Sequence, residues 1–390
     1  MDQIGLSNNT ITLINSTTDR TPSPDAIVAQ WANFLCYQLL GFPISVFGVF
    51  GNVMSIWVWT RQSMQWGTSS TSCYLVTLSC SDMFYLLTTN LGLLLPNWMR
   101  YTQDGFQPLF TAPAQKLVVK SVFTPIVDTL SNVSFYLVVA FTVERWIAVN
   151  YPILSLAICR PQRARYIILC VIAAVIVLHI PEYIENVPAL QKRGYSESKG
   201  YNIGYNWGVM VLFFAVTPLA LLSVFNTLLV REVLLSKRSR ANLTQANKDN
   251  AYMAVTITII LVVVLSFICH TPAATILVVF TYREQRQLIT AQEKSKWKVA
   301  FAIANLLSII NSSVNFLLYS AFSAKFRITC CKLICPKLYK HDRQNGVKFN
   351  RDATIVTTAL KSKPSSSIQS NAQSIPLLHQ NGTDTDAQKD

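Results

Sequence analysis

The sequence is poor in charged residues and in the residue groupings that catalysis or metal binding requires. Only 13% of its 390 residues are charged, whereas 51% are hydrophobic; the charged share is about half that of a typical soluble domain. The four histidines are scattered along the chain, and they form no metal-ligand or nucleophile constellation with other residues. These absences argue against a soluble protein and against an enzyme, and they predict no resident cofactor.

Cysteine is missing from the segments where an extracellular disulfide would form. Nine cysteines are present, but none lies in a segment predicted to face outward, and residues 183–206 contain none. We therefore predict no disulfide. Residues 1–30 also lack an apolar core, so a cleavable signal peptide is not expected, and the first apolar segment must direct insertion into the membrane.

What the chain does have is seven long apolar segments. A helix needs about 20 residues to cross a bilayer, and the segments run roughly over 34–60, 71–97, 118–149, 163–182, 204–235, 250–280 and 297–321. We predict an all-α membrane protein whose seven-helix bundle spans residues 34–321. A disordered, glycosylated tail (1–33) precedes the bundle, and a membrane-surface helix (322–335) and a disordered cytoplasmic tail (336–390) follow it.

Charge and glycosylation signals orient this bundle. Lys and Arg are more frequent in the loops and proximal tail that lie inside if the N-terminus is outside, as the positive-inside rule requires. The sequons at Asn8 and Asn15 suit an extracellular tail. The basic residues behind the net charge of +14 border the apolar segments, so we assign them to anionic lipid headgroups and not to nucleic acid.

An acid and an arginine stand side by side where the third segment reaches its inner end. Glu144 and Arg145 follow an uncharged stretch from Leu130 to Val143, and Tyr151-Pro152 comes soon after. Ionisable residues at the end of a span are costly to place and indicate function. The pattern resembles the (Asp/Glu)-Arg-Tyr…Pro signature of rhodopsin-like G-protein-coupled receptors.

Further motifs resemble the same family in order and spacing. They are Gly51-Asn52 in the first segment, Leu78-x-x-x-Asp82 in the second, Phe267-x-Cys269-His270-x-Pro272 in the sixth and Asn311-x-x-x-Asn315-x-x-x-Tyr319 in the seventh. The form Asn-Ser-Ser-Val-Asn-Phe-x-x-Tyr resembles invertebrate neuropeptide receptors of the FMRFamide and myosuppressin type. The resemblance implies a cell-surface receptor for a peptide that signals through a heterotrimeric G protein.

The resemblance also assigns roles to individual residues. It places a switch for the G protein at Glu144, Arg145, Asn315 and Tyr319, and a hinge at Cys269, His270 and Pro272. It further implies a polar core, able to hold an allosteric sodium ion, formed by Asn52, Asp82, Ser134, Asn311 and Asn315. Oxygen ligands from Asp, Ser and Asn suit a hard cation such as sodium.

Asp128 is the candidate ligand-binding residue. It precedes Arg145 by 17 residues, or about 26 Å along a helix, which places it in the outer third of the third segment. The residue at the amine-binding position of aminergic receptors is Val127, which disfavours an amine receptor. Asp128 is available to a cationic ligand group such as Arg, or to an internal ion pair with Lys120 or another basic residue of the outer bundle.

The chain departs from the family at several positions. Lys120 stands where most members have the disulfide-forming Cys, His270 replaces Trp, and Phe316 replaces Pro. Lipid and melanocortin receptors also lack that disulfide, so a lipid-mediator receptor is the alternative function. A transporter is disfavoured because no repeat is visible.

Two features of the C-terminal part predict modification. Cys330, Cys331 and Cys335 follow the last span among alternating apolar and basic residues, a setting that suits palmitoylation on the inner leaflet. The Ser/Thr-rich tail beyond them offers weak signals for receptor kinases, and hence for arrestin.

Overall fold

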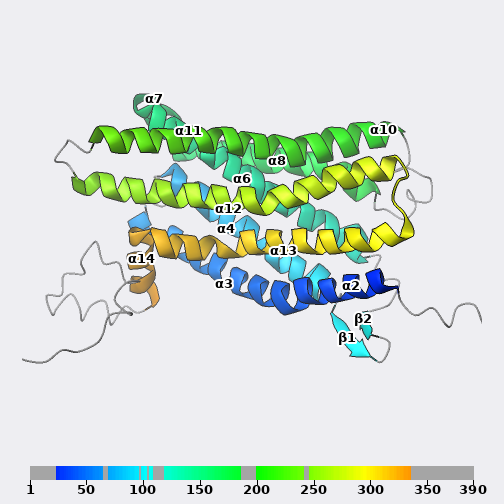
Figure 1. The fold of residues 1–390 in the computed structure, drawn as a ribbon. Helices are drawn as coiled ribbons and strands as arrows, with labels where there is room; N and C mark the ends of the chain where they lie inside the picture. Colours follow the sequence, from blue (N-terminus) through cyan, green and yellow to red (C-terminus); the bar gives the residue numbers. More distant parts are fainter. Residues whose placement is uncertain are drawn as a thin grey trace, which may run out of the picture. The chain divides into compact units, whose positions relative to one another are not determined.

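The computed structural model describes residues 23–64, 69–95, 98–102, 105–108, 118–185, 199–240 and 246–334. Nearly all of them are helical, and the long helices lie side by side in a bundle (Figure 1). The predicted seven-helix membrane bundle is therefore confirmed. The predicted C-terminal tail and the sequons at Asn8 and Asn15 lie outside the described residues.

The helices follow the predicted segments in order. The first is continuous from α2 (Pro24–Asn33) through the π-helical η1 (Phe34–Gly41) to α3 (Phe42–Trp59), and the second joins α4 (Ser70–Thr89) to η3 (Asn90–Leu94). The third joins η4 (Val119–Phe123) to α6 (Thr124–Asn150), and α8 (Pro161–Glu185) is the fourth. The remaining long helices are the fifth, made of α10 (Lys199–Tyr201), η6 (Asn202–Val216) and α11 (Thr217–Arg240), then α12 (Ala246–Gln285) and α13 (Ala291–Phe322).

Short elements lie at the two ends of the bundle. At the end that the sequence assigns to the outside, called the outer end below, strands β1 (Met99–Thr102) and β2 (Gly105–Pro108) form an antiparallel hairpin. At the inner end, α7 (Pro152–Ile158) follows α6, and α14 (Ala324–Ile334) follows α13. The latter confirms the helix predicted after the seventh span.

The first helix begins ten residues earlier than predicted. Residues 24–33, assigned to the disordered tail, form α2, because Pro24 suits the first helical turn and Ser23 caps it, accepting a hydrogen bond from the Ala26 N–H at 3.3 Å. The whole helix Pro24–Trp59 has 36 residues, or about 54 Å. It therefore extends beyond a hydrocarbon core of about 30 Å.

The second helix differs from the other long helices in polarity. Among the described residues, six helices are long and apolar enough to cross a membrane, and α4 is not one of them. It contacts α3, α6, α8 and α13, and its polar residues, including Ser72, Ser79 and Asp82, are buried among these neighbours. Its polarity therefore faces protein, which a helix in the interior of a membrane bundle tolerates.

Each π-helical segment ends two residues before a proline. The segments η1, η3, η4 and η6 precede Pro43, Pro96, Pro125 and Pro218. In each case the residue before the proline donates its backbone N–H to the carbonyl of the residue five positions earlier, as Thr217 does to Leu212. Proline lacks an N–H and its ring crowds the preceding turn, so a widened turn accommodates Pro43, Pro125 and Pro218 within continuous helices.

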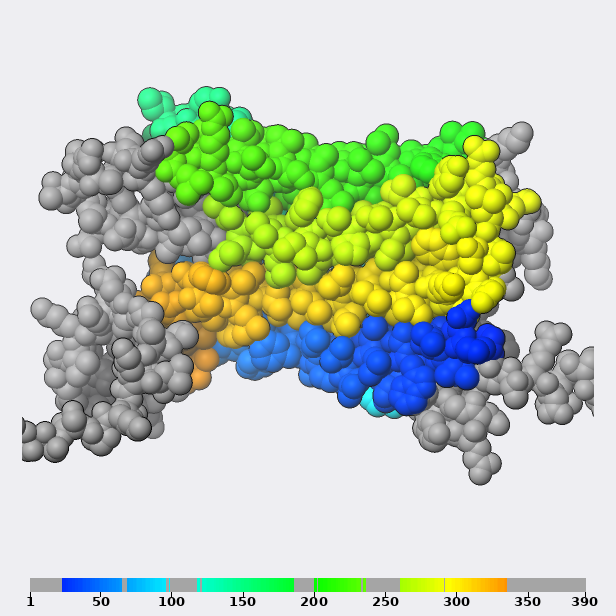
Figure 2. Space-filling model, viewed as in Figure 1, coloured from blue at the N-terminus to red at the C-terminus, as the bar shows by residue number. Residues whose placement is uncertain are grey.

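The face of the bundle seen in Figure 2 is formed in turn by α11, α12, α13 and the first helix. Close approach of two helices depends on Gly48 of α3, where an added Cβ would lie 2.2 Å from the Ser313 Oγ of α13. A capping box of Thr290 and Glu293 begins α13, and an ion pair of 2.9 Å between Arg283 and Glu293 holds that end against α12.

Candidate functional site

The predicted switch residues at the inner end of α6 are buried and form an ion pair with each other. The Arg145 Nη2 lies 2.7 Å from the Glu144 Oε1, and the two residues are 8% and 5% exposed. The Ser70 hydroxyl of α4 donates to the same carboxylate oxygen at 2.5 Å. The Arg145 guanidinium also lies over the Phe141 ring, 5.2 Å from its centroid. This arrangement fixes Arg145 between α4 and its own helix.

The short helix α7 is tied to this pair by Cys159. Its thiol contacts the backbone carbonyl of Glu144, with 3.8 Å between sulfur and oxygen. Burial, followed by the nearby Glu144 carboxylate, raises the pKa of the Cys159 thiol. The neutral thiol is therefore the form that donates this hydrogen bond.

Asp82 is the centre of the polar core. Its Oδ2 accepts a hydrogen bond of 2.7 Å from the Asn315 Nδ2 of α13, and the side chains of Ser134 and Ser312 interact with the same carboxyl group. The Asp82 Oδ1 and the Ser134 Oγ are buried, and neither completes a hydrogen bond of good geometry with a described residue. Buried oxygens of this kind are those that a sodium ion or a water would bind.

The other two predicted core residues lie around this centre and connect helices. Asn52 donates to the backbone carbonyls of Ser312 at 2.9 Å and of Gly48 at 3.0 Å, which links α3 to α13. Asn311 accepts a hydrogen bond of 3.0 Å from the Ser266 hydroxyl of α12. The structure thus joins Asn311 to the sixth helix and places Ser312, which the sequence did not single out, beside Asp82.

Tyr319 is packed at the inner end of α13 against the helix that follows. Its ring lies 5.6 Å from the rings of both Trp59 and Phe326. Phe326 is fully buried and anchors α14 to the bundle. This predicted switch residue therefore belongs to the contact between α3, α13 and α14.

The predicted hinge connects the polar core to a cavity. The Nδ1 of His270 donates to the Ser266 carbonyl at 2.8 Å, and the imidazole stacks on Phe135 of α6 with 4.0 Å between ring centroids and 7° between planes. Cys269 is buried and Pro272 lies within α12. His270 therefore contacts α6 on one side and leads through Ser266 to Asn311 on the other.

The cavity lies in the outer half of the bundle and has a volume of about 510 Å³. His270, Phe135, Asn132 and Asp128 line it, so the predicted ligand residue faces it directly. The π-helical segments also contribute, with Tyr37 from η1 and residues of η3 and η6. Widened turns before prolines thus shape the wall of the cavity.

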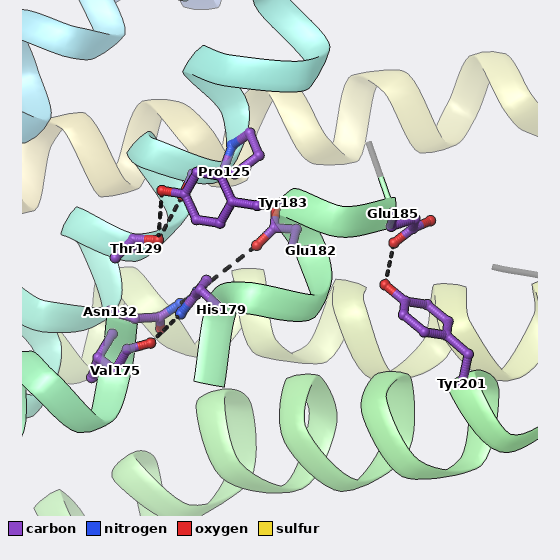
Figure 3. A network of polar contacts seen from close by, with 9 residues as sticks. All are labelled: Pro125, Thr129, Asn132, Val175, His179, Glu182, Tyr183, Glu185 and Tyr201. Atoms are coloured by element: carbon purple, nitrogen blue, oxygen red, sulfur yellow. Dashed lines mark hydrogen bonds and ion pairs between the residues drawn. The ribbon is translucent and has the colours of Figure 1, made fainter. Parts of the chain in front are cut away.

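A polar network on one side of the cavity joins α6 to α8 (Figure 3). The His179 Nδ1 donates to the Val175 carbonyl at 2.9 Å, which leaves Nε2 of the neutral ring to accept from the Asn132 amide at 3.2 Å. The Thr129 and Tyr183 hydroxyls lie 3.3 Å apart, and Thr129 donates to the Pro125 carbonyl at 2.7 Å. These contacts tie the outer half of α6 to α8.

Asp128 takes part in the same network through a second acid. Its carboxyl group interacts electrostatically with that of Glu182 on α8, and the Glu182 Oε2 lies 3.9 Å from the His179 Nε2. The side chain of Lys120, the alternative partner, lies outside the described residues. Next to this pair, the Tyr201 hydroxyl donates to the Glu185 carboxylate and links the start of the fifth helix to the end of α8 (Figure 3).

The three predicted palmitoylation sites differ in accessibility. Cys331 is exposed, whereas Cys330 is 9% exposed, and its burial raises the pKa of its thiol. Cys335 lies outside the described residues. The structure therefore favours Cys331 over Cys330 for acylation from the membrane surface.

The contacts of His179 and Glu182 on α8 were not predicted from the sequence, which assigned Glu182 only to the mixed charge at the mouth of the bundle. Neither residue belongs to a family motif, and the predicted fourth segment ended at Glu182. Their signal was present, since ionisable residues three positions apart in a helix share a face and are costly within a span. Asn132 and Ser312 carried no such signal, because Asn and Ser occur in membrane helices as ordinary packing residues.

Comparison with known proteins extends these observations. The sequence pattern of the family described as 7 transmembrane receptor (rhodopsin family) matches residues 51–319. The chain is 27% identical to an FMRFamide receptor of Drosophila melanogaster over 342 residues, which cover 83% of this chain and 59% of that protein. The chain thus spans less than two thirds of the length of the fly protein.

Two further relatives are similar at comparable levels. An FMRFamide peptide receptor of Caenorhabditis elegans is 24% identical, over 80% of this chain and 72% of that protein. An allatostatin-A receptor of Bombyx mori is 24% identical, over 76% of this chain and 79% of that protein. The names of all three relatives refer to peptides.

Proposed function

The chain belongs to the rhodopsin family of seven-transmembrane receptors, and we propose that it is a plasma-membrane receptor for a neuropeptide that activates a heterotrimeric G protein. Its N-terminus would lie outside the cell and its C-terminal tail in the cytoplasm. The observation that carries the proposal is the outer cavity, which an acid, Asp128, faces from its wall and His270 from α12. The relatives are receptors for peptides by name.

The contacts between cavity and core support transmission along the bundle axis. A ligand that moves the stacked Phe135–His270 pair changes the surroundings of Ser266, which donates to Asn311. A signal of this kind needs a structural element that can switch between two positions. In our proposal this element is α12. Its inner movement would open the bundle beside Arg145.

Arg145 is the residue that we propose for contact with the G protein. In this structure it is held by Glu144 and Ser70, as suits a resting state. Once released, its planar guanidinium offers five donors to backbone or side-chain acceptors of an entering helix. The Tyr319 ring, which lies at the same end, would change its contacts with the neighbouring rings during that movement.

The polar core fits the sodium ion that the family resemblance implies. Asp82, Ser134 and Asn315 would hold it, since the Asp82 Oδ1 and the Ser134 Oγ are buried and complete no hydrogen bond of good geometry with a described residue. When bound, the ion supplies positive charge beside a buried carboxylate and stabilises the closed core. Receptor kinases and arrestin, which would act on the Ser/Thr-rich tail, stay predictions from the sequence.

The test is a screen at the cell surface. The full chain, with surface expression measured, is exposed to a library of amidated neuropeptides and to a library of acyl lipids, with a promiscuous G-protein reporter. We expect a peptide response that Arg145→Ala abolishes at equal surface expression, while Arg160→Ala, at an exposed position between α7 and α8, retains it. A response to lipids alone would refute the peptide proposal, and full signalling by Arg145→Ala would refute the role of Arg145.

A further inference from the structure

Two histidines in the outer half of the bundle bond to their own helices in the same way. The Nδ1 of His270 donates to the Ser266 carbonyl at 2.8 Å, and that of His179 donates to the Val175 carbonyl at 2.9 Å. A neutral imidazole has one N–H and one acceptor nitrogen, so the acceptor is Nε2 in both rings. The Nε2 of His179 accepts from Asn132, whereas that of His270 accepts from no described residue.

The same reasoning orients the side-chain amide of Asn132. Its nitrogen lies 3.2 Å from the His179 Nε2 (Figure 3), and of the two ends of an amide only the NH2 group donates to such an acceptor. The amide oxygen is therefore directed away from His179 and is left as an acceptor. Because Asn132 lines the cavity, this acceptor is available to a ligand.

The two acceptors lie beside a flat aromatic surface. Asn132 and Phe135 are three residues apart on α6 and so share a face. The Phe135 ring stacks on His270, with 4.0 Å between ring centroids and 7° between planes. Phe135 and His270 are the innermost lining residues of α6 and α12. We call Asn132, Phe135 and His270 the floor of the cavity; it combines a stacked pair of rings with two hydrogen-bond acceptors.

The rest of the cavity wall is largely apolar and holds no base. Side chains such as Met210, Phe214, Leu277 and Phe301 surround the floor. Among the described residues that line the cavity, no lysine or arginine is found, and Asp128 is the one acid. A carboxylate placed here would meet acceptors and an acid, and burial of such an unpaired charge is costly. The floor therefore suits a group that donates hydrogen bonds and disfavours an anion.

We propose that the floor of the cavity binds an aromatic side chain that carries a hydrogen-bond donor, namely a tyrosine or a tryptophan of a peptide. Its ring packs against the Phe135–His270 stack, and its O–H or N–H donates to the His270 Nε2 beside the Asn132 oxygen. The cavity volume of about 510 Å³ is in the range of pockets that enclose a small ligand. This inference rests on the proposed peptide-receptor function and specifies the side chain that its cavity selects.

Phenylalanine is the side chain that such a floor should reject. It has the same ring as tyrosine but no donor, so its entry would remove water from both acceptors and replace none of their hydrogen bonds. Buried polar groups without partners are costly, and a site built to bond a ligand hydroxyl discriminates against the analogue that lacks it. We expect tyrosine to bind at least about tenfold more tightly than phenylalanine in the same position.

The first experiment compares two small probes on the purified receptor. N-acetyltyrosinamide and N-acetylphenylalaninamide are both neutral and differ only in the phenolic hydroxyl. Their affinities for the full chain in lipid nanodiscs are measured by saturation-transfer NMR at millimolar concentrations. We expect N-acetyltyrosinamide to have a Kd about tenfold lower. Equal affinities, or no binding of the tyrosine probe, would overturn the proposal.

The second experiment locates this discrimination with the variant His270→Phe. The new ring can still stack on Phe135, but it offers no acceptor, so the ratio of the two affinities should fall toward one. Thr271→Val is the matched control, because Thr271 donates its hydroxyl to the Phe267 carbonyl at 2.7 Å and does not line the cavity. It should keep the wild-type ratio. A wild-type ratio in His270→Phe would refute the floor as the binding site.

These measurements need neither a G protein nor an agonist, so their outcome is separate from that of the peptide screen. A screen without a response would refute the proposed function and leave the result for the two probes standing. An active peptide that contains neither tyrosine nor tryptophan would support the function and refute this subsite. Full potency after replacement of these residues by phenylalanine would have the same meaning.

Discussion

At the scale of single residues, the polar side chains within the bundle fall into two groups. Some join helices by hydrogen bonds, and others have buried polar atoms whose hydrogen-bonding capacity is not fully used. Asn52, Asn315 and Ser266 each bond to a residue of another helix at 3.0 Å or less. The Asp82 Oδ1 and the Ser134 Oγ, which complete no hydrogen bond of good geometry with a described residue, lie in the same core. Joining residues stabilise the fold, and open ones mark where a ligand or water is accommodated.

The hydrogen bond from Asn315 to Asp82 is expected to contribute measurably to stability. Asn315→Ala removes the donor and leaves a buried acceptor unsatisfied, which costs about 1–3 kcal/mol. The midpoint of thermal unfolding of the purified receptor should fall accordingly. Leu317→Ala, at a 46% exposed position of the same helix, is the control, and an equal effect of both variants would contradict the role of the hydrogen bond.

A second prediction concerns the close contact of α3 with α13. In Gly48→Ala the new methyl group would lie 2.2 Å from the Ser313 Oγ and 2.7 Å from the Leu86 Cδ1, so the helices must separate. Overpacking of this kind costs about 1–3 kcal/mol. Gly204→Ala, where no atom lies within 4 Å, should unfold at the wild-type temperature. Thermal unfolding of the two variants side by side tests the contact.

At the scale of elements, prolines and buried aromatics decide how the helices sit. The π-helical turns before Pro43, Pro125 and Pro218 keep these helices continuous and change the winding of their outer halves. A wider turn changes which residues face inward, and several of those residues line the cavity. The π-helical turns therefore help to form the cavity, in keeping with their frequent occurrence at functional sites.

The docking of α14 is predicted to depend on Phe326. Its side chain is fully buried against Trp59, Phe316 and Tyr319, and removing a buried Phe ring costs about 3–5 kcal/mol. In Phe326→Ala we expect α14 to detach and the thiol of Cys330 to react with a maleimide as fast as an exposed cysteine.

Phe322→Ala provides the control for this prediction. Phe322 precedes α14 and is 44% exposed, so its replacement should leave Cys330 protected while exposed Cys331 reacts in every variant. Protection of Cys330 in Phe326→Ala would show that other contacts hold the helix in place.

At the scale of the whole molecule, the direction of insertion is the property that all functional proposals share. If the N-terminus lies outside, Asn8 and Asn15 carry glycans, and Asn381 does not. Treatment with a peptide N-glycosidase should then shift the electrophoretic mobility of the wild type, and the double variant Asn8→Gln/Asn15→Gln should abolish the shift.

Asn381→Gln is the matched control because its sequon lies in the predicted cytoplasmic tail. It should show the wild-type shift. Loss of the shift in Asn381→Gln alone would reverse the topology, and with it the assignment of cavity and switch to the two sides of the membrane.

Much of the candidate site was accessible from local sequence because its residues are costly in a membrane helix. Asp82, Glu144 and Arg145 stood out by their charge, and the helical spacing placed Asp128 toward the outer end. The start of the first helix was wrong by ten residues, because the Asn/Thr-rich composition of the tail outweighed the capping signal of Ser23 and Pro24.

The seven helices, their order and the set of polar residues inside them follow from local sequence, since length, hydropathy and charge are local properties. Which of those residues meet depends on the tertiary structure. It joined Asn311 to Ser266, Ser312 to Asp82 and Asp128 to Glu182. Such pairings depend on the rotation and height of each helix against its neighbours, which packing across the bundle sets and no single segment encodes.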